Sequence, residues 1–252
     1  MQLAGVAAIV TGGASGLGAA TTAALAKAGA SVHVFDLAAS IENAARTAGA
    51  TYTAVDVTSP EQVRSAVASL VEDGLPLRVV VNCAGIGPSA RILGRKGTHD
   101  LGLFSKVLQV NLAGSFNVLT LAAEAIAQTD PDEHGQRGVI INTASVAAFD
   151  GQIGQAAYAA SKGGIAALTL PAARDLAQHG IRVMCIAPGI ILTPMLMTVS
   201  EEYRAGLSAG VPFPQRLGDP AEYAQLVTSI VDNDYLNGEV IRLDGALRMA
   251  PR

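Results

Sequence analysis

The stretch TGGASGLG, residues 11–18, decides the fold that this sequence predicts. It follows the apolar run VAAIVT and opens a run of helical composition. Its key glycines are Gly12, Gly16 and Gly18. Glycine lets the backbone come close to a phosphate, and the N–H groups at the start of a helix favour an anion. The spacing TGxxxGxG differs from the common GxGxxG, and by itself it could equally form a tight strand-to-helix turn.

Asp36 supplies the context that the glycine loop needs. It lies at the end of the second apolar run, SVHVFD, about 20 residues beyond the loop, where an acid can bind a ribose diol. A carboxylate there repels a 2′-phosphate, and residues 13–17 and 37–41 contain no Lys or Arg to accept one. We therefore expect a dinucleotide site that takes NAD rather than NADP.

Short apolar runs alternate with helical ones along the rest of the chain. The expected strands are 6–11, 31–36, 51–57, 78–85, 138–145, 181–189 and 239–245. The expected helices are 16–29, 41–48, one that opens at Ser59-Pro60-Glu61, 101–128, 155–178 and one that opens at Asp219-Pro220. Continuously apolar strands in this alternation predict an α/β fold, a Rossmann-type doubly wound parallel sheet with helices on both faces. We expect a single domain over 1–252, with a substrate loop region at about 190–218 beside the carboxyl ends of the strands.

Composition excludes several classes of protein. The chain has 252 residues, of which 50% are hydrophobic and 15% charged, so a disordered protein is excluded. A net charge of −4 without a long basic stretch argues against a nucleic-acid partner. No window reaches the roughly 18 apolar residues of a membrane span, so we expect no membrane partner and a soluble, cytoplasmic protein. Cys83 and Cys185 fall in strand-like runs as reduced thiols, and the four scattered histidines match no metal site.

The segment QAAYAASKGG, residues 155–164, places a tyrosine and a lysine one helical turn apart. Tyr158 and Lys162 are at positions i and i+4, so they lie on the same face of a helix. An isolated pair of this kind usually belongs to a solvated helix surface. A cation one turn away would, however, favour the phenolate form of the tyrosine, which is the form that can act as a base.

A set of ordered motifs connects this pair to the glycine loop. The chain resembles the short-chain dehydrogenase/reductase family in TGGASGLG (11–18), NCAG (82–85), Asn111, TAS (143–145), YAASK (158–162) and PG…TP (188–194). Within that family it is similar to the short-chain (type II) 3-hydroxyacyl-CoA dehydrogenases, a group that includes 17β-hydroxysteroid dehydrogenases. Four segments carry this closer likeness: 135–149, 154–165, 211–224 and 236–246. The likeness is weakest at 87–106 and 196–208, where substrate contacts are expected.

The resemblance implies roles for a small set of residues in the chemistry. Tyr158 would be the general acid/base, and Lys162 would favour its phenolate and hydrogen-bond the nicotinamide ribose. Ser145 would hold the substrate oxygen and stabilise the charge that develops on it. Asn111 would link the lysine to solvent through a water. Gln155, near the start of the same helix, resembles a substrate-pocket residue, although an exposed glutamine at a helix start fits it nearly as well.

The resemblance also implies the contacts of an NAD cofactor. Asp36 would hold a ribose, Asp56 and Val57 would line the adenine slot, and Ile191 and Thr193 would receive the carboxamide. Cys83 would act only through its backbone. The full expected set is Gly12, Ser15, Gly16, Leu17, Gly18, Asp36, Asp56, Val57, Cys83, Ala84, Gly85, Tyr158, Lys162, Pro188, Ile191 and Thr193.

The expected function is therefore NAD-dependent hydride transfer that interconverts 3-hydroxyacyl-CoA and 3-oxoacyl-CoA. A 3-oxoacyl-carrier-protein reductase, a hydroxysteroid or secondary-alcohol dehydrogenase, and a non-catalytic dinucleotide-binding scaffold remain alternatives. Arg95 and Lys96 would steer the CoA moiety, although a short basic cluster is more usually a solvated loop. In the family the helices at 101–128 and 155–178 build a dimer interface, and two such dimers make a homotetramer. Pro171 should bend the second helix or break its hydrogen-bond ladder.

Overall fold

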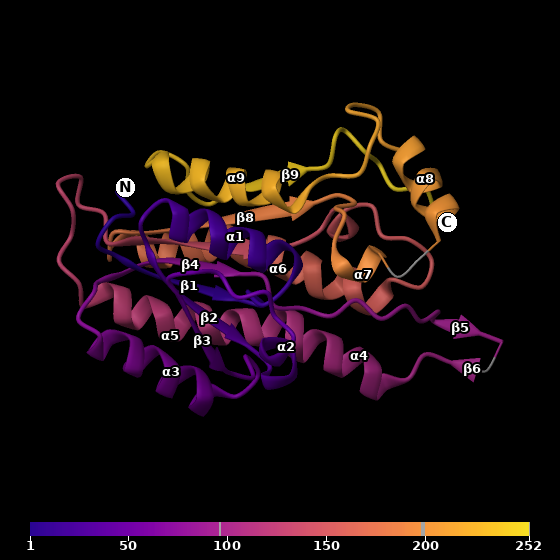
Figure 1. Ribbon diagram of the computed structural model, residues 1–252. Coiled ribbons are helices and arrows are strands. Elements are labelled where there is room, and N and C mark those ends of the chain that lie inside the picture. The colour runs from indigo at the N-terminus through magenta and orange to yellow at the C-terminus, as the bar shows by residue number, and fades with distance from the viewer. Residues whose placement is uncertain (96, 198–199, 252) are drawn as a thin grey trace.

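The structure is a computed structural model, in which residues 1–95, 97–197 and 200–251 are described. Seven strands of this part of the chain form one parallel sheet, in the order β3-β2-β1-β4-β7-β8-β9 (Figure 1). They are β1 (Ala7–Thr11), β2 (Ser31–Asp36), β3 (Ala50–Ala54), β4 (Leu77–Asn82), β7 (Gly138–Thr143), β8 (Ile181–Pro188) and β9 (Val240–Leu243). The chain adds strands outward from β1 to β3 and then returns to place β4 on the other side of β1. The expected Rossmann-type α/β domain is confirmed, and ligands of such sheets bind at this change of direction.

Helices cover both faces of the sheet. They are α1 (Gly16–Lys27), α2 (Ala38–Glu42), α3 (Pro60–Glu72), α4 (Leu101–Leu108), α5 (Ser115–Ala127), α6 (Ala156–Ala177), α7 (Pro194–Met197), α8 (Glu201–Ala209) and α9 (Pro220–Asp232). α1 and α9 pack on strand residues such as Val10 and Ile141. α3, α5 and α6 pack on the opposite face, on residues such as Ile9 and Ile140 (Figure 1). Because successive residues of a strand point to opposite faces, one apolar run supplies side chains to the core on both faces of the sheet.

Two helices begin where the sequence predicts. Ser59 caps α3, since its Oγ accepts a hydrogen bond from the backbone N–H of Gln62 at 3.3 Å, and Pro60 follows at the first helical position. Asp219 caps α9 in a capping box, in which the carboxylate of Glu222 accepts a hydrogen bond from the Asp219 backbone N–H at 2.8 Å. The second cap fixes the direction in which α9 crosses the sheet.

Two boundaries differ from the expectation. The helix expected at 41–48 is α2, at Ala38–Glu42, and it ends where the side-chain amide of Asn43 donates to a carbonyl one turn back at 2.8 Å. β3 ends before the expected boundary because the carboxylate of Asp56 turns the chain. Its Oδ1 accepts hydrogen bonds from the backbone N–H and the hydroxyl of Thr58, at 2.9 and 2.7 Å.

The helix expected at 101–128 has three parts. Between α4 and α5 lies a π-helical segment, η1, at Gln109–Gly114. Such a segment widens one turn of a helix and is frequent at functional sites. By length and composition Leu101–Ala127 could cross a membrane, contrary to the expectation, but core helices of globular proteins pass the same test. Here Val118 and Ile126 of α5 are buried in the core against the sheet.

Three further features were not expected. The region at 190–218 contains the short helices α7 and α8. A two-stranded hairpin, β5 (Leu93–Gly94) with β6 (Gly97–Thr98), projects from the same end of the molecule (Figure 1). α6 continues through Pro171, and the expected bend there stays a prediction.

Candidate active site

The glycine loop folds tightly against the end of β4. Gly12 has φ +65°, and a Cβ on it would lie 2.8 Å from the backbone nitrogen of Ala84. A Cβ on Gly18 would overlap the carbonyl oxygen of Gly12, so neither position admits a side chain. Ser15 stands at the N-cap of α1 without a side-chain capping bond, and the first turn of α1 carries no acid. The start of α1 therefore presents N–H groups and a positive dipole end that fit the pyrophosphate of a dinucleotide.

Asp36 is fixed beside this loop by two backbone hydrogen bonds. Its Oδ2 accepts from the N–H of Ala14 at 3.0 Å, and its Oδ1 accepts from the N–H of Leu37 at 2.8 Å. The carboxylate thus joins the end of β2 to the glycine loop of β1. A ribose diol placed between them would meet a negatively charged acceptor, as an NAD site requires.

Val57 and Asp56 follow the end of β3, where an adenine ring is expected. Val57 is buried, its carbonyl accepts a hydrogen bond from the Asn117 side chain at 2.9 Å, and a Cβ on Gly114 would lie 2.7 Å from its Cγ2. The carboxylate of Asp56 is engaged in the turn with Thr58. These two residues therefore build the wall of the slot as part of a rigid turn.

A cleft of about 230 Å³ opens at the carboxyl ends of the central strands. Its lining is Leu17, Cys83, Gly85, Ile86, Gly87, Thr143, Ala144, Ser145, Tyr158, Lys162, Pro188, Gly189, Ile191 and Thr193. The structure thus brings the expected catalytic residues Ser145, Tyr158 and Lys162 together with six of the expected cofactor residues. Thr193 reaches back to the glycine loop, where a Cβ on Gly16 would lie 3.5 Å from its Cγ2. The cleft and the loop form one continuous site.

Lys162 is buried in this cleft, with 5% of its surface exposed. Its Nζ donates a hydrogen bond to the carbonyl oxygen of Thr143 at 2.6 Å and lies 5.9 Å from the centre of the Tyr158 ring. The two residues occupy successive turns of α6, as their spacing predicts. A buried lysine therefore stands beside the phenol of Tyr158 inside the cleft.

Ser145 begins the 3-10 turn η2 (Val146–Ala148) directly after β7. Its Oγ accepts a hydrogen bond from the backbone N–H of Ala147 at 3.1 Å. This bond uses an oxygen lone pair and leaves the hydroxyl proton to donate into the cleft. The side chain can therefore hold a substrate oxygen.

Asn111 lies on the π segment, with its side chain buried. Its Oδ1 accepts from the N–H of Ile86, and its Nδ2 donates to the carbonyl of Ile86, both at 2.8 Å. A Cβ on Gly85 would lie 3.1 Å from Asn111 Oδ1 and 3.6 Å from Lys162 Nζ, so the two polar ends converge beside this glycine. A link from the lysine to solvent through a water, the role expected for the asparagine, stays a prediction.

The structure places Gln155 outside the cleft. Its Oε1 accepts a hydrogen bond from the N–H of Gln152 at 2.9 Å, which closes the turn before α6. Gln155 lines a neighbouring pocket of about 400 Å³, together with Arg91 and the start of the β5–β6 hairpin. A direct substrate contact stays a prediction. Arg95 is exposed on the same hairpin, and Lys96 lies outside the described residues.

Two residues without an expected role meet at the cleft wall, where Thr143 lines the cleft and Tyr223 lies behind it. Thr143 offers its carbonyl to Lys162, and its hydroxyl lies 2.7 Å from the hydroxyl of Tyr223 on α9. Burial raises the pKa of Tyr223 well above the usual value and also raises the pKa of the Cys83 thiol. The motif TAS could have indicated Thr143, but no pattern in the sequence indicates Tyr223.

Comparison with known proteins identifies the family of the chain. The family profile described as short chain dehydrogenase matches residues 6–204. The chain belongs to the short-chain dehydrogenase family. Members of this family are oxidoreductases that use a nicotinamide dinucleotide, which agrees with the glycine loop, the acid at the end of β2 and the Tyr158–Lys162 pair of this chain.

Similar members of the short-chain dehydrogenase family match the chain over nearly its full length. "3-hydroxyacyl-CoA dehydrogenase type-2" of Homo sapiens is 54% identical, over 98% of this chain and 97% of that protein. The protein of the same name from Bos taurus is 53% identical, with the same coverage. The crystal structure of 3-hydroxyacyl-CoA dehydrogenase type-2 from Mycobacterium avium superimposes with a TM-score of 0.91 at 43% identity, covering 98% of both chains.

Proposed function

We propose that this short-chain dehydrogenase interconverts 3-hydroxyacyl-CoA and 3-oxoacyl-CoA with NAD as the hydride carrier. One observation carries the proposal: Ser145, Tyr158 and Lys162 line a single cleft that is continuous with the glycine loop and its acid. The names of the relatives, which match nearly the whole chain, support the substrate class. A non-catalytic scaffold would not need these side chains to converge.

The residues divide the chemistry among themselves. In the oxidation direction Tyr158 removes the proton of the substrate hydroxyl, while Ser145 hydrogen-bonds the same oxygen and fixes its position. A bound nicotinamide would supply the hydride acceptor, and the residues of this chain would supply its placement beside the carbon that carries this oxygen. Lys162 stands beside the Tyr158 ring and would hydrogen-bond the nicotinamide ribose, and Asn111 would lead the released proton toward solvent through a water. In the reduction direction the same groups act in reverse order.

NAD is the favoured cofactor because of Asp36. Its carboxylate is held against the glycine loop by Ala14 N–H at 3.0 Å, so it cannot swing away from an added 2′-phosphate without losing that bond. The same feature disfavours a 3-oxoacyl-carrier-protein reductase that uses NADPH. The test measures kcat/KM with both cofactors on a CoA ester, a carrier-protein thioester, a steroid and a secondary alcohol. NADPH preference on the carrier-protein thioester would reverse the proposal.

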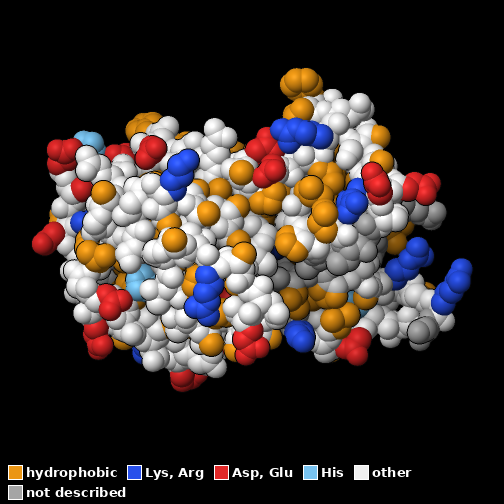
Figure 2. All heavy atoms as spheres, viewed as in Figure 1, with side chains coloured by type: hydrophobic (Ala, Val, Ile, Leu, Met, Phe, Trp, Pro, Cys, Tyr) orange, Lys and Arg blue, Asp and Glu red, His pale blue; other side chains and the backbone are white. Residues whose placement is uncertain are grey.

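The β5–β6 hairpin would receive the CoA moiety. Arg91 and Arg95 are exposed on it, and Figure 2 shows basic side chains standing out at this end of the molecule. Ile92 and Leu93 beside them are 72% and 73% exposed, so the hairpin presents both charge and apolar surface. The phosphates of coenzyme A would meet the arginines, mostly through screened surface attraction.

A homotetramer is the proposed assembly. α5 and α6 line a groove of about 610 Å³, and Phe116 of α5 in its lining is 53% exposed. Exposed apolar side chains along a groove favour a protein partner. Phe116→Glu should reduce the mass measured by sedimentation, whereas an unchanged mass would contradict this interface.

The two free thiols, Cys83 and Cys185, support a reducing compartment such as the cytoplasm.

A further inference from the structure

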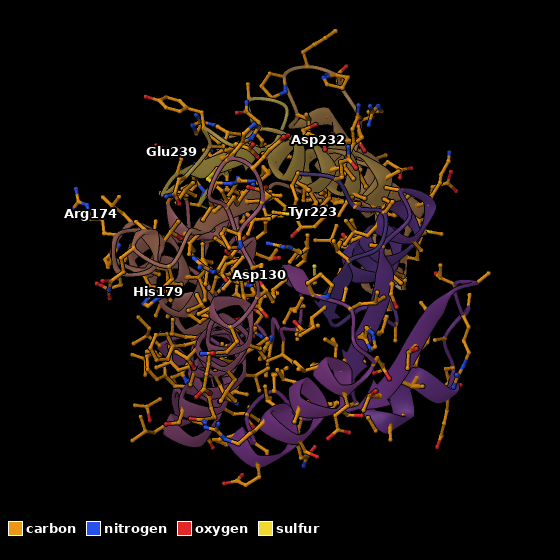
Figure 3. All side chains as sticks on the ribbon, turned by 90° about the vertical axis from the view of Figure 1, so that its left-hand side faces the viewer. Asp130, Arg174, His179, Tyr223, Asp232 and Glu239 are labelled. Carbon is orange, nitrogen blue, oxygen red and sulfur yellow. The ribbon has the colours of Figure 1, made fainter. Side chains whose placement is uncertain are left out.

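Tyr223 is a buried polar residue that the proposed chemistry does not use. It lies on the first turn of α9 with 0% of its surface exposed, in the layer between α1, α9 and the sheet. Figure 3 shows it in the interior beneath α9, whereas Arg174 and His179 lie at the outside. A hydroxyl in an apolar layer costs free energy unless it is hydrogen-bonded, so its partners explain its place.

Three side chains from three elements meet at this hydroxyl. Tyr223 Oη lies 2.7 Å from Thr143 Oγ1 at the end of β7. Cys83, just beyond β4, donates its thiol proton to Tyr223 Oη at 3.6 Å, and Thr143 Oγ1 donates to Cys83 Sγ at 3.7 Å. The three groups form a closed triangle of donors and acceptors. Burial raises the pKa of both Tyr223 and Cys83, so the triangle is uncharged at neutral pH.

This triangle stands directly behind the cleft. Thr143 and Cys83 both line the cleft, and the carbonyl of Thr143 is the acceptor for Lys162 at 2.6 Å. The hydroxyl of Thr143 points to the α9 layer, so one residue joins the buried tyrosine on one side to the catalytic lysine on the other. Tyr223 itself is absent from the cleft lining. It can therefore act on the site only through Thr143 and Cys83.

We propose that Tyr223 is a positioning residue for the nicotinamide end of the cofactor site. Its hydroxyl holds the Thr143 side chain and the Cys83 thiol from behind, so that the cleft wall and the carbonyl that anchors Lys162 keep one arrangement. The inference rests on the proposed function only in that the cleft receives a nicotinamide nucleotide. It predicts the larger effect on the nicotinamide half, since Thr143 and Lys162 line the cleft, whereas Asp36, which would hold the adenosine ribose, stands at the end of β2.

The variant Tyr223→Phe isolates the hydroxyl, because the ring and its packing remain. Its first readout needs no ligand. Cys83 and Cys185 are the two cysteines of the chain, and Cys83→Ala identifies the infrared S–H stretching band of Cys83. In Tyr223→Phe this band should move to higher frequency because the thiol loses its acceptor. An unmoved band would overturn the triangle, whatever the protein catalyses.

The second readout compares NAD with ADP-ribose, which lacks the nicotinamide, by calorimetric titration. We expect Tyr223→Phe to bind NAD roughly 3- to 10-fold more weakly, the effect of one buried hydrogen bond, and ADP-ribose within twofold of wild type. Thr143→Val should reproduce this selective loss, whereas Thr143→Ser keeps the hydroxyl and should bind NAD like the wild type. The double variant Tyr223→Phe with Thr143→Val should lose little more than either single variant. Equal losses for both ligands, or none, would overturn the proposal.

Val227→Ala is the matched control for mere destabilisation. Val227 is fully buried one turn further along α9, and it has no hydroxyl. Its truncation should lower the melting temperature but leave the ratio of NAD to ADP-ribose affinity unchanged. If the wild type binds NADP instead of NAD, the cofactor choice is wrong, and the same comparison then uses NADP and 2′-phospho-ADP-ribose.

Discussion

Lys162 Nζ donates to the backbone carbonyl of Thr143 at 2.6 Å, so the ammonium is anchored by the end of a strand and not by a side chain. A backbone acceptor cannot rotate away, and the lysine therefore stands at a fixed place beside the Tyr158 ring, 5.9 Å from its centre. This arrangement separates two tasks. In the proposed mechanism the lysine holds the cofactor side of the cleft, and the tyrosine moves the proton.

Tyr158→Phe should abolish turnover while leaving NAD binding nearly intact. The phenolic oxygen takes part in proton transfer, whereas the ring that remains still fills its place in the cleft. A loss of kcat of about 10²- to 10⁴-fold is typical for removal of a general acid–base group. Steady-state kinetics on a 3-hydroxyacyl-CoA together with NAD titration would measure both quantities. Wild-type kcat in this variant would remove Tyr158 from the mechanism.

Asp36→Ala combined with Leu37→Arg should shift preference from NAD toward NADP. The first change removes a charge that repels the 2′-phosphate, and the second supplies a cation at the exposed position that follows β2. The ratio of kcat/KM for the two cofactors is the measurement. Leu37→Arg alone is the control, because it retains the carboxylate and should shift the ratio less. An unchanged ratio in the double variant would mean that another residue selects the cofactor.

The pair His134 and Asp234 should make stability depend on pH. His134 Nδ1 lies 2.9 Å from Asp234 Oδ2, and this hydrogen bond raises the pKa of His134 and lowers the pKa of Asp234. The histidine contribution is complete below the unfolded pKa of 6.5 and disappears as pH rises through the raised folded value. The aspartate contribution is present above 3.8 and disappears as pH falls through the lowered folded value.

The difference in melting temperature between wild type and His134→Ala should therefore be greatest near about pH 5 and should shrink as pH rises through the raised pKa of His134. Both residues are far from the cleft, so kcat should not change. His179→Ala, at an exposed histidine on the same side of the molecule, is the control (Figure 3). A difference that grows with pH would contradict the assignment of the pair.

The strands and the candidate cleft could be predicted because their signals are local. Ser145 and Tyr158 stand in short motifs at a strand end and a helix start, and the fold brings such ends to one edge of the sheet. Tyr223 could not be predicted, because its partner Thr143 is 80 residues away and nothing in the sequence pairs them. The β5–β6 hairpin was missed for a different reason. Strands of two residues leave no alternation of apolar and polar side chains to detect.

Arg91→Gln combined with Arg95→Gln tests the proposed contact with the CoA moiety. Both arginines are exposed on the hairpin segment at the strand ends where substrates are expected, in a protein of net charge −4. We expect KM for a 3-hydroxyacyl-CoA to rise about 3- to 10-fold at low ionic strength and less in high salt, because exposed charges are screened. KM for an uncharged secondary alcohol should hardly change, and kcat should hold for both substrates because the reacting centre is untouched.

Arg174→Gln is the control, since Arg174 is an exposed arginine in the last turn of α6 and not on the hairpin (Figure 3). Equal increases in KM for charged and uncharged substrates would show that the hairpin supports the fold of the cleft and does not bind CoA.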